Sequence, residues 1–156
     1  MATTITAATL TVTVTEAITL NGQDYGAKNT LTISNIVEIS KRIIEIPTSE
    51  IVILTFAATN PAPGGFDEAD VRYVRLTNKD ATNHLTLVFR SENGNECAHK
   101  LDAGHTFILA ADNSGGVVDI HDADASALTV SFDDLVDITA LANTEAVDLA
   151  LYVAGV

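Results

Sequence analysis

The densest group of potential metal ligands lies late in the chain. Asp119, His121, Asp122 and Asp124 fall within one short stretch, and loop carboxylates supply the oxygen ligands that Ca²⁺ prefers. In an extended stretch Asp119 and His121 would share a face, because alternate residues of a strand point the same way. The spacing does not match the EF-hand pattern. A solvated acidic loop is the favoured interpretation, and these four residues remain weak candidates for a Ca²⁺ site.

Cys97 and His99 come nearest to a nucleophilic pair. They lie two positions apart in a predicted strand at 96–101, so both point to one face. A thiolate beside an imidazole would permit covalent catalysis, but free cysteine is more often a buried, inert packing residue. No G-x-S-x-G, H-E-x-x-H or C-x-x-C spacing occurs in the chain. The sequence therefore predicts no catalytic residue, no enzyme and no cofactor.

Composition narrows the classes of partner. The chain has 156 residues, the length of one domain, and carries 8 Lys and Arg against 21 Asp and Glu, a net charge of −13. Nucleic acid and anionic membranes attract clustered Lys and Arg, so neither is an expected partner. A single cysteine cannot form an internal disulfide. Aromatic residues make up 5% of the chain and Trp is absent, which argues against a stacking platform for sugars.

The elements that must position any site are predicted to be strands. Leu10, Val12 and Val14 alternate with threonines, which is typical of a half-buried strand. Similar strand-like segments lie at 30–39, 43–46, 51–56, 71–76, 84–90, 96–101, 106–109, 126–132, 136–141 and 146–153. Short strands separated by frequent turns indicate an all-β fold: an antiparallel, jelly-roll-like β-sandwich of about nine or ten strands. Isoleucines at near-helical spacing leave one short helix open at 36–44.

Three local features refine this prediction. Asn21-Gly22 favours a type I′ turn, although the polar stretch as far as Gly26 suggests a longer loop. The alternation slips near Asn35, which suggests a β-bulge. We expect residues 1–156 to form a single domain, in which residues 1–15 are either an extended arm or the first strand of the sandwich.

Three stretches resemble small virion proteins of tailed bacteriophages. Residues 13–22 resemble an opening strand of those proteins, and residues 137–140 with 147–149 resemble their last two strands. Residues 71–80 carry the pattern R-Y-x-R-[IL]-T-N, and the strand-like segment at 84–89 follows it as in those proteins. The resemblance implies a β-sandwich structural protein of the phage particle, either a capsid decoration (cement) protein or a tail-associated one.

The expected function is therefore non-enzymatic. As a decoration protein, the chain would bridge neighbouring capsomers on the outer surface of the virion after synthesis in the host cytoplasm. Its partners would be copies of itself, with a trimer weakly favoured, and the major capsid protein or other virion proteins. The alternatives are a tail or fibre adapter of the same particle and a carbohydrate-binding β-sandwich. Thr9, Leu10, Val12 and Val14 are the candidate interaction residues, since an arm at 2–15 could add a strand to a neighbouring subunit.

Overall fold

The computed structural model describes residues 4–57, 65–111, 116–118 and 134–156. These ranges contain thirteen strands and no helix, so the all-β prediction is confirmed. The strands are β1 (Ala8–Glu16), β2 (Thr19–Leu20), β3 (Gln23–Asp24), β4 (Ala27–Ile36), β5 (Glu38–Ile46), β6 (Ile51–Ala57), β7 (Phe66–Asp67), β8 (Val71–Asn78), β9 (Leu85–Ser91), β10 (Glu96–Leu101), β11 (Thr106–Ala110), β12 (Leu135–Ala142) and β13 (Val147–Gly155).

Two details of the prediction need correction. The count of about nine or ten strands was too low, because β2, β3 and β7 add pieces of two residues each. The helix considered at 36–44 is wrong, since this stretch contains the end of β4 and most of β5. Its isoleucines are β-branched and suit a pleated strand, and all of β5 pairs with β13. The strand predicted at 126–132 lies outside the described residues.

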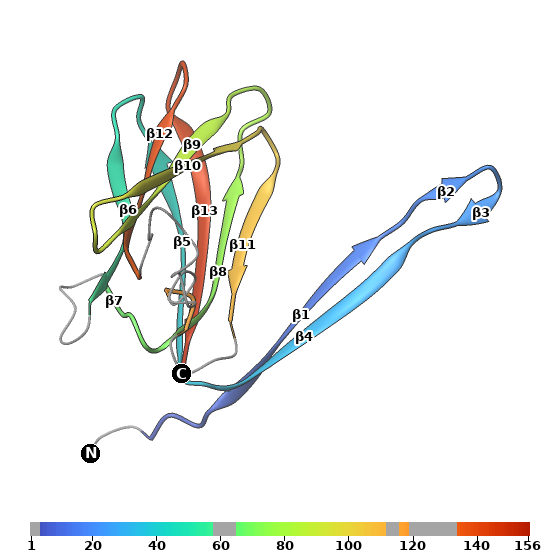
Figure 1. Ribbon diagram of the computed structural model, residues 1–156, viewed down its shortest axis with the longest axis horizontal. Coiled ribbons are helices and arrows are strands. Elements are labelled where there is room, and N and C mark those ends of the chain that lie inside the picture. The colour runs from blue at the N-terminus through green and yellow to red at the C-terminus, as the bar shows by residue number, and fades with distance from the viewer. Residues whose placement is uncertain (1–3, 58–64, 112–115, 119–133) are drawn as a thin grey trace.

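The body of the molecule is a sandwich of two sheets with jelly-roll topology (Figure 1). One sheet has the order β11-β8-β13-β5, and the other has the order β10-β9-β12-β6-β7. Apart from the short β7, the two sheets contain eight strands: β5, β6 and β8–β13. If these are numbered one to eight along the chain and each sheet is read from its earliest strand, the first sheet has the order 1-8-3-6 and the second has the order 2-7-4-5. This order is that of a double Greek key. Every pairing in the two sheets is antiparallel except the short parallel contact between β6 and β7.

The core lies between the two sheets and follows the alternation of the strands. In β13 the residues Leu149, Leu151 and Val153 point inward and are buried, whereas Asp148 points outward and is exposed. The facing sheet supplies the same kind of side chain from β9 and β12. The largest fully buried members of this core are Ile46, Leu54, Leu76, Leu85, Leu87, Leu101, Leu135, Ile138, Leu149 and Leu151. Burying branched aliphatic side chains of this size stabilises a fold by about 1.5–3 kcal/mol each.

Residues 8–36 form a β-hairpin, which we call the arm, that belongs to neither sheet of the sandwich. Strand β1 pairs with β4 from Glu16↔Ala27 back to Ala8↔Ile36, and β2 pairs with β3 at the far end. Figure 1 shows the arm leaving the base of the sandwich and projecting well away from it. The hairpin closes at Asn21 and Gly22, whose φ angles of 52° and 79° suit a two-residue type I′ turn. The longer loop suggested for this position is therefore not present.

The joint between the arm and the sandwich is fixed at three places. Strand β4 has one residue more than β1 between the pairs Leu10↔Ile33 and Ala8↔Ile36, which confirms the predicted bulge, and Asn35 has a φ of 64° there. Just beyond the bulge, the amide of Val37 donates a 3.0 Å hydrogen bond to the carbonyl of Gly155. Ile33 and Ile36 are buried against Tyr73 of β8 and against the end of β13. The root of the arm is thus part of a second, smaller apolar cluster.

Candidate interaction surface

The metal site considered at Asp119, His121, Asp122 and Asp124 lies outside the described residues. Among the residues that the structure does describe, no group of three or more His, Cys, Asp or Glu side chains could hold a metal ion. The Ca²⁺ hypothesis therefore stays a prediction from the sequence. The same described ranges contain no helix long and apolar enough to cross a membrane.

Cys97 and His99 lie on β10, at the outer edge of the five-stranded sheet. Both side chains are exposed, so the expectation that Cys97 is buried is wrong. The reason is its position, because an edge strand is covered on one side only. The His99 ring packs against Phe107, with ring centroids 5.0 Å apart, and Phe107 contacts Phe89 of the core. His99 thus helps to cover the gap between β10 and β11.

The four candidate interaction residues lie on β1, and the chain's own β4 already occupies one edge of that strand. Leu10 and Val12 pack against the cluster at the root of the arm, while Val14 and Thr9 are exposed. Two of the four residues therefore hold the arm to its own sandwich. On the face that carries Leu10 and Val12, the arm is exposed from Val14 outward.

The two faces of the arm differ in chemistry. Directly paired residues share a face, so the pairs Leu10↔Ile33 and Val12↔Leu31 form an apolar face at the root. The same face continues through Val14 to Glu16, which pairs with Ala27. The opposite face carries a double row of threonines followed by the pair Thr15↔Lys28: the rows are Thr11, Thr13 and Thr15 on β1 and Thr30 and Thr32 on β4. The arm therefore has one face suited to dry contact and one suited to water.

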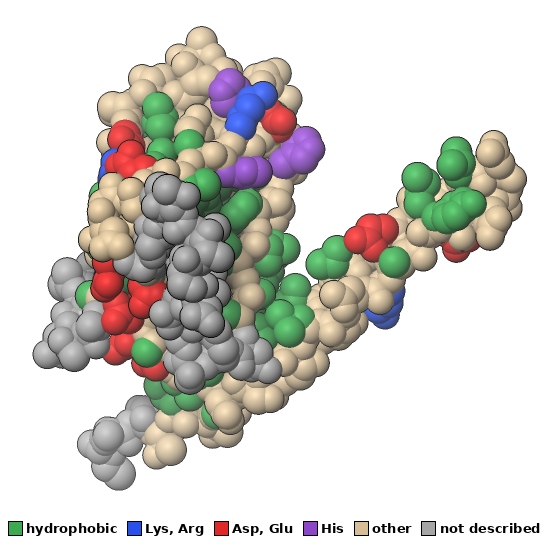
Figure 2. Space-filling view, viewed as in Figure 1, with side chains coloured by type: hydrophobic (Ala, Val, Ile, Leu, Met, Phe, Trp, Pro, Cys, Tyr) green, Lys and Arg blue, Asp and Glu red, His purple; other side chains and the backbone are tan. Residues whose placement is uncertain are grey.

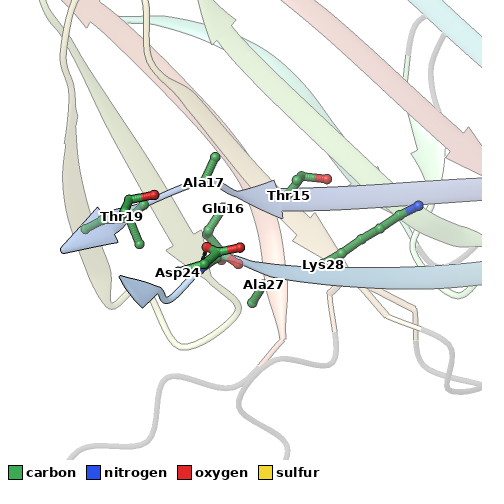
Figure 3. Close-up of a pocket in the computed structure, with 9 residues that line it drawn as sticks. Thr15, Glu16, Ala17, Thr19, Asp24, Ala27 and Lys28 are labelled. Atoms are coloured by element: carbon green, nitrogen blue, oxygen red, sulfur yellow. Dashed lines mark hydrogen bonds between the residues drawn. The ribbon is translucent and has the colours of Figure 1, made fainter. Parts of the chain in front are cut away.

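The tip of the arm exposes apolar side chains far from the core. We define the tip as residues 14–28. Ile18, Leu20 and Tyr25 are 55%, 57% and 59% exposed, and Figure 2 shows apolar side chains gathered at this end of the arm. A shallow hollow forms where the ribbon bends between β1 and β2, and Glu16 and Asp24 both line it (Figure 3). Lys28 points away from these two carboxylates, so the tip combines apolar and acidic character.

A tight bend shapes the hollow in the tip. The carboxylate of Asp24 accepts a 2.7 Å hydrogen bond from the amide of Gly26. A Cβ atom at Gly26 would lie 2.6 Å from the carbonyl oxygen of Glu16, so only glycine fits between the two strands. The positions of Glu16 and Asp24 are thereby set by backbone packing.

A second feature is a groove on the outer face of the four-stranded sheet. We call it the cationic groove; the side chains that matter in it are Lys41, Ile43, Arg75, Lys79 and Ala150. It contains three of the 8 Lys and Arg residues of a chain whose net charge is −13. Arg42 points to the opposite face of the sheet, where its guanidinium donates a 3.0 Å hydrogen bond to the carbonyl of Ile53 on β6. The guanidinium of Arg75 lies 5.5 Å from the ring centroid of Tyr152, which orients this cation along the sheet. Ile43 is the most exposed large hydrophobic residue of this sheet, at 67%.

The opposite side of the sandwich is acidic. Figure 2 shows carboxylates gathered on the side away from the arm. Burial, followed by the nearby charges of Glu92, Asp134 and Asp67, raises the pKa of Glu68. Arg90 forms ion pairs of 2.6 Å with Glu50 and 2.7 Å with Glu96, and lies 3.7 Å from Asp137. Burial raises the pKa of Asp137 even though Arg90 acts in the opposite direction. Carboxylates therefore outnumber cations on this side of the sandwich. They are not confined to it, because Glu45 and Asp148 form an exposed pair on the outer face of the four-stranded sheet.

The R-Y-x-R-L-T-N stretch on β8 has structural roles in this protein. Arg72 donates a hydrogen bond to the carbonyl of Ala69. Tyr73 lies on the outer face of the sheet beneath the root of the arm, where burial raises its pKa. Asn78 is fully buried and donates to the carbonyls of Asn83 and Leu101 at 2.9 and 3.2 Å. This pattern positions the arm and closes the end of the sandwich.

Replacement of Tyr73 by Ala is expected to loosen the arm. The Tyr73 ring is 4% exposed and meets Tyr152 edge to face, with centroids 5.9 Å apart. Truncating a buried aromatic residue costs about 3–5 kcal/mol when the cavity stays open, and here the cost falls first on the contact with Ile33 and Ile36. Amide hydrogen exchange across β1 and β4 should accelerate at least tenfold. Replacing the exposed Tyr25 by Ala is the matched control, and equal exchange in both variants would contradict this role.

Sequence reasoning missed both the tip and the cationic groove. Ile18, Leu20 and Tyr25 occupy ordinary strand-and-turn positions, and their exposure follows from the arm standing clear of the sheets. The cations of the groove come from β5, β8 and the residue after β8, and only the strand order brings them together. A usable signal was the scarcity of Lys and Arg, because four of them lie in just two segments, 41–42 and 75–79.

A scan against protein-family models found no match, and a search of curated proteins found none either. Among solved structures, a chain of Bacillus endospore appendages, described as a novel family of disulfide-linked pili, is similar to this one. The alignment has 13% sequence identity, covers 76% of this chain and 84% of that chain, and gives a TM-score of 0.41. A likeness of this size carries no argument about function.

Proposed function

We propose that this protein is a non-enzymatic structural subunit that works by contact with other protein chains. One observation carries the proposal: a two-stranded arm that displays Ile18, Leu20 and Tyr25 away from the core of its own chain. An isolated hairpin is at best marginally stable in water, and exposed apolar clusters mark contact surfaces. The arm is therefore expected to be covered by a neighbour in the working state.

The more specific proposal is a decoration protein that stabilises the capsid of a tailed bacteriophage from outside. Its support is the resemblance of residues 71–80, and of residues 137–140 with 147–149, to small virion proteins, together with a jelly roll, a fold that viral capsid proteins also use. The net charge of −13 suits a surface turned away from a packaged genome. Many copies would multiply a modest energy per contact.

Particle stability tests this proposal. Particles that carry the protein should release their genome at a higher temperature than particles lacking it, as followed by the fluorescence of a DNA-binding dye during heating. Adding the purified chain back should restore the higher release temperature. Identical release temperatures with and without the protein would refute the decoration role. Copy number distinguishes the alternative, because a tail or fibre adapter would be present in a handful of copies at one place on the particle.

A further inference from the structure

We propose that the tip of one copy docks into the cationic groove of a second copy of the same chain. This inference deepens the proposed structural role and rests on it. In the proposed contact, the carboxylates of Glu16 and Asp24 on the tip lie against Lys41 and Lys79 in the groove. The apolar side chains of Ile18 and Leu20 lie against Ile43 and Ala150. The contact would join different surfaces on the two copies.

Charge complementarity supports a second copy as the occupant. The groove carries Lys41, Arg75 and Lys79, whereas the chain as a whole has a net charge of −13. The acidic side of the sandwich of a second copy would match only the charge of the groove, because that side is an irregular polar surface. The tip offers both features that the groove can match, because its two carboxylates lie among exposed apolar side chains. Opposite charges at such a contact favour one orientation over others.

The tip does not reach the groove of its own chain. Leu10 and Val12 pack at the root of the arm, and the eight residues that follow Val12, up to Leu20, extend the tip by roughly 26 Å at about 3.3 Å per residue. Figure 1 shows that this extension leads away from the sandwich. The root covers the outer face of the sheet only near Tyr73, and the part that carries Lys41, Ile43 and Lys79 stays open. A tip in this groove must therefore come from another molecule.

The two hollows beside the arm are continuous on the sheet. The space between the arm and its own sheet is lined by Val14 and Ile108, and Arg75 and Thr106 line both this space and the cationic groove. An incoming tip would therefore lie beside the resident arm and extend the apolar surface already formed there. A head-to-tail contact of this kind closes into a ring or continues as a filament, depending on the rotation between copies.

The experiment uses one charge reversal on each side of the proposed contact. In sedimentation velocity, Glu16→Lys on the tip and Lys41→Glu in the groove should each weaken self-association about tenfold or more, because like charges then face each other. Glu92→Lys and Lys100→Glu are matched controls on other exposed surfaces and should associate as the wild type does. An equimolar mixture of the tip and groove variants should form pairs, since one intact tip and one intact groove remain. The double variant Glu16→Lys/Lys41→Glu should regain much of the lost affinity.

An apolar pair of variants provides a second measurement. Ile43→Ser removes a 67% exposed side chain from the groove, and Val52→Ser removes a 55% exposed side chain from the other sheet. Only the first should weaken association. Wild-type affinity in the Glu16→Lys and Ile43→Ser variants, or a wild-type protein that stays monomeric, would overturn this inference. Particle stabilisation by such a monomer would still uphold the proposed function, so the two failures are distinguishable. A groove variant that self-associates normally but no longer binds particles would instead assign the groove to a shell protein, and would also overturn the inference.

Discussion

Replacement of residues 17–26 by a two-residue Asn-Gly turn is expected to abolish self-association and leave the jelly roll folded. The pair Glu16↔Ala27 is the last one before the bend, so a short turn can close the hairpin there. The change removes Ile18, Leu20 and Tyr25, whose side chains are all more than half exposed and add nothing to the core. Each would bury apolar area on docking, and together they account for the largest apolar contribution that the arm can make.

Two measurements separate association from folding in this variant. Sedimentation velocity should show a monomer at concentrations where the wild type assembles, and the midpoint of thermal unfolding, followed by circular dichroism under dissociating conditions, should stay within a few degrees. Thr13→Lys, on the threonine face of the arm, is the control and should assemble normally. Assembly of the shortened chain at the wild-type concentration would show that the tip is dispensable. A collapse of the thermal transition would show that the tip belongs to the folding unit.

Replacement of Asn78 by Ala is expected to cause the largest loss of stability among polar substitutions. The Asn78 amide donates to the carbonyls of Asn83 and Leu101, and its oxygen accepts a 2.9 Å hydrogen bond from the amide of Asp80. Alanine would leave buried groups without partners, at about 1–3 kcal/mol for each, so a loss of about 3 kcal/mol or more is expected. Asn29→Ala, at an exposed position of the arm, is the matched control.

Denaturant unfolding measures this loss, and a second variant tests its cause. Asn78→Asp keeps an acceptor for the amide of Asp80 but points a carboxylate at two carbonyl oxygens. The loss in unfolding free energy of Asn78→Asp relative to the wild type should become smaller at acidic pH, because protonation of the introduced carboxylate restores a hydrogen-bond donor. A midpoint for Asn78→Ala equal to that of Asn29→Ala would show that the buried hydrogen bonds contribute little.

The turn beside Asn78 should lose stability in acid, because it depends on the charged carboxylate of Asp80. The carboxylate of Asp80 accepts hydrogen bonds of 2.7 Å from the amides of Thr82 and Asn83. These backbone donors hold the pKa of Asp80 below its usual range, so its contribution is present at neutral pH and is lost only as the pH falls through that lowered value. The Asn78 variants are therefore best compared above this range, where the turn itself is intact.

Strands such as β9 and β13 were predictable because more and less buried side chains alternate along each of them. Leu85, Leu87 and Phe89 are buried, whereas Thr86, Val88 and Arg90 between them are only partly buried, and this local alternation indicates a strand wherever the strand finally packs. The error at 36–44 has the opposite origin. Isoleucine at four positions there satisfies a helical period and a strand equally well, and the pairing of β5 with β13, which is remote in sequence, decides between them.

The arm was harder to predict for a physical reason. The alternation of Leu10, Val12 and Val14 is the same whether β1 lies in a sheet, joins another chain or pairs with β4. Likewise, the ring of Tyr73 lies on the outer face of its sheet and is buried only because the arm covers it. In both cases the sequence shows which side chains need cover. It does not show which segment supplies that cover.

The joint at Val37 also has a mechanical consequence. A pull on the tip enters the body through β4 and passes directly into β5, because only Val37 separates the two strands. All nine residues of β5 pair with β13, from Glu38↔Gly155 to Ile46↔Val147. Tension on the arm is therefore shared by a continuous ladder in the sheet. A sudden pull on the tip would be spread over that ladder before any single hydrogen bond carried the whole load.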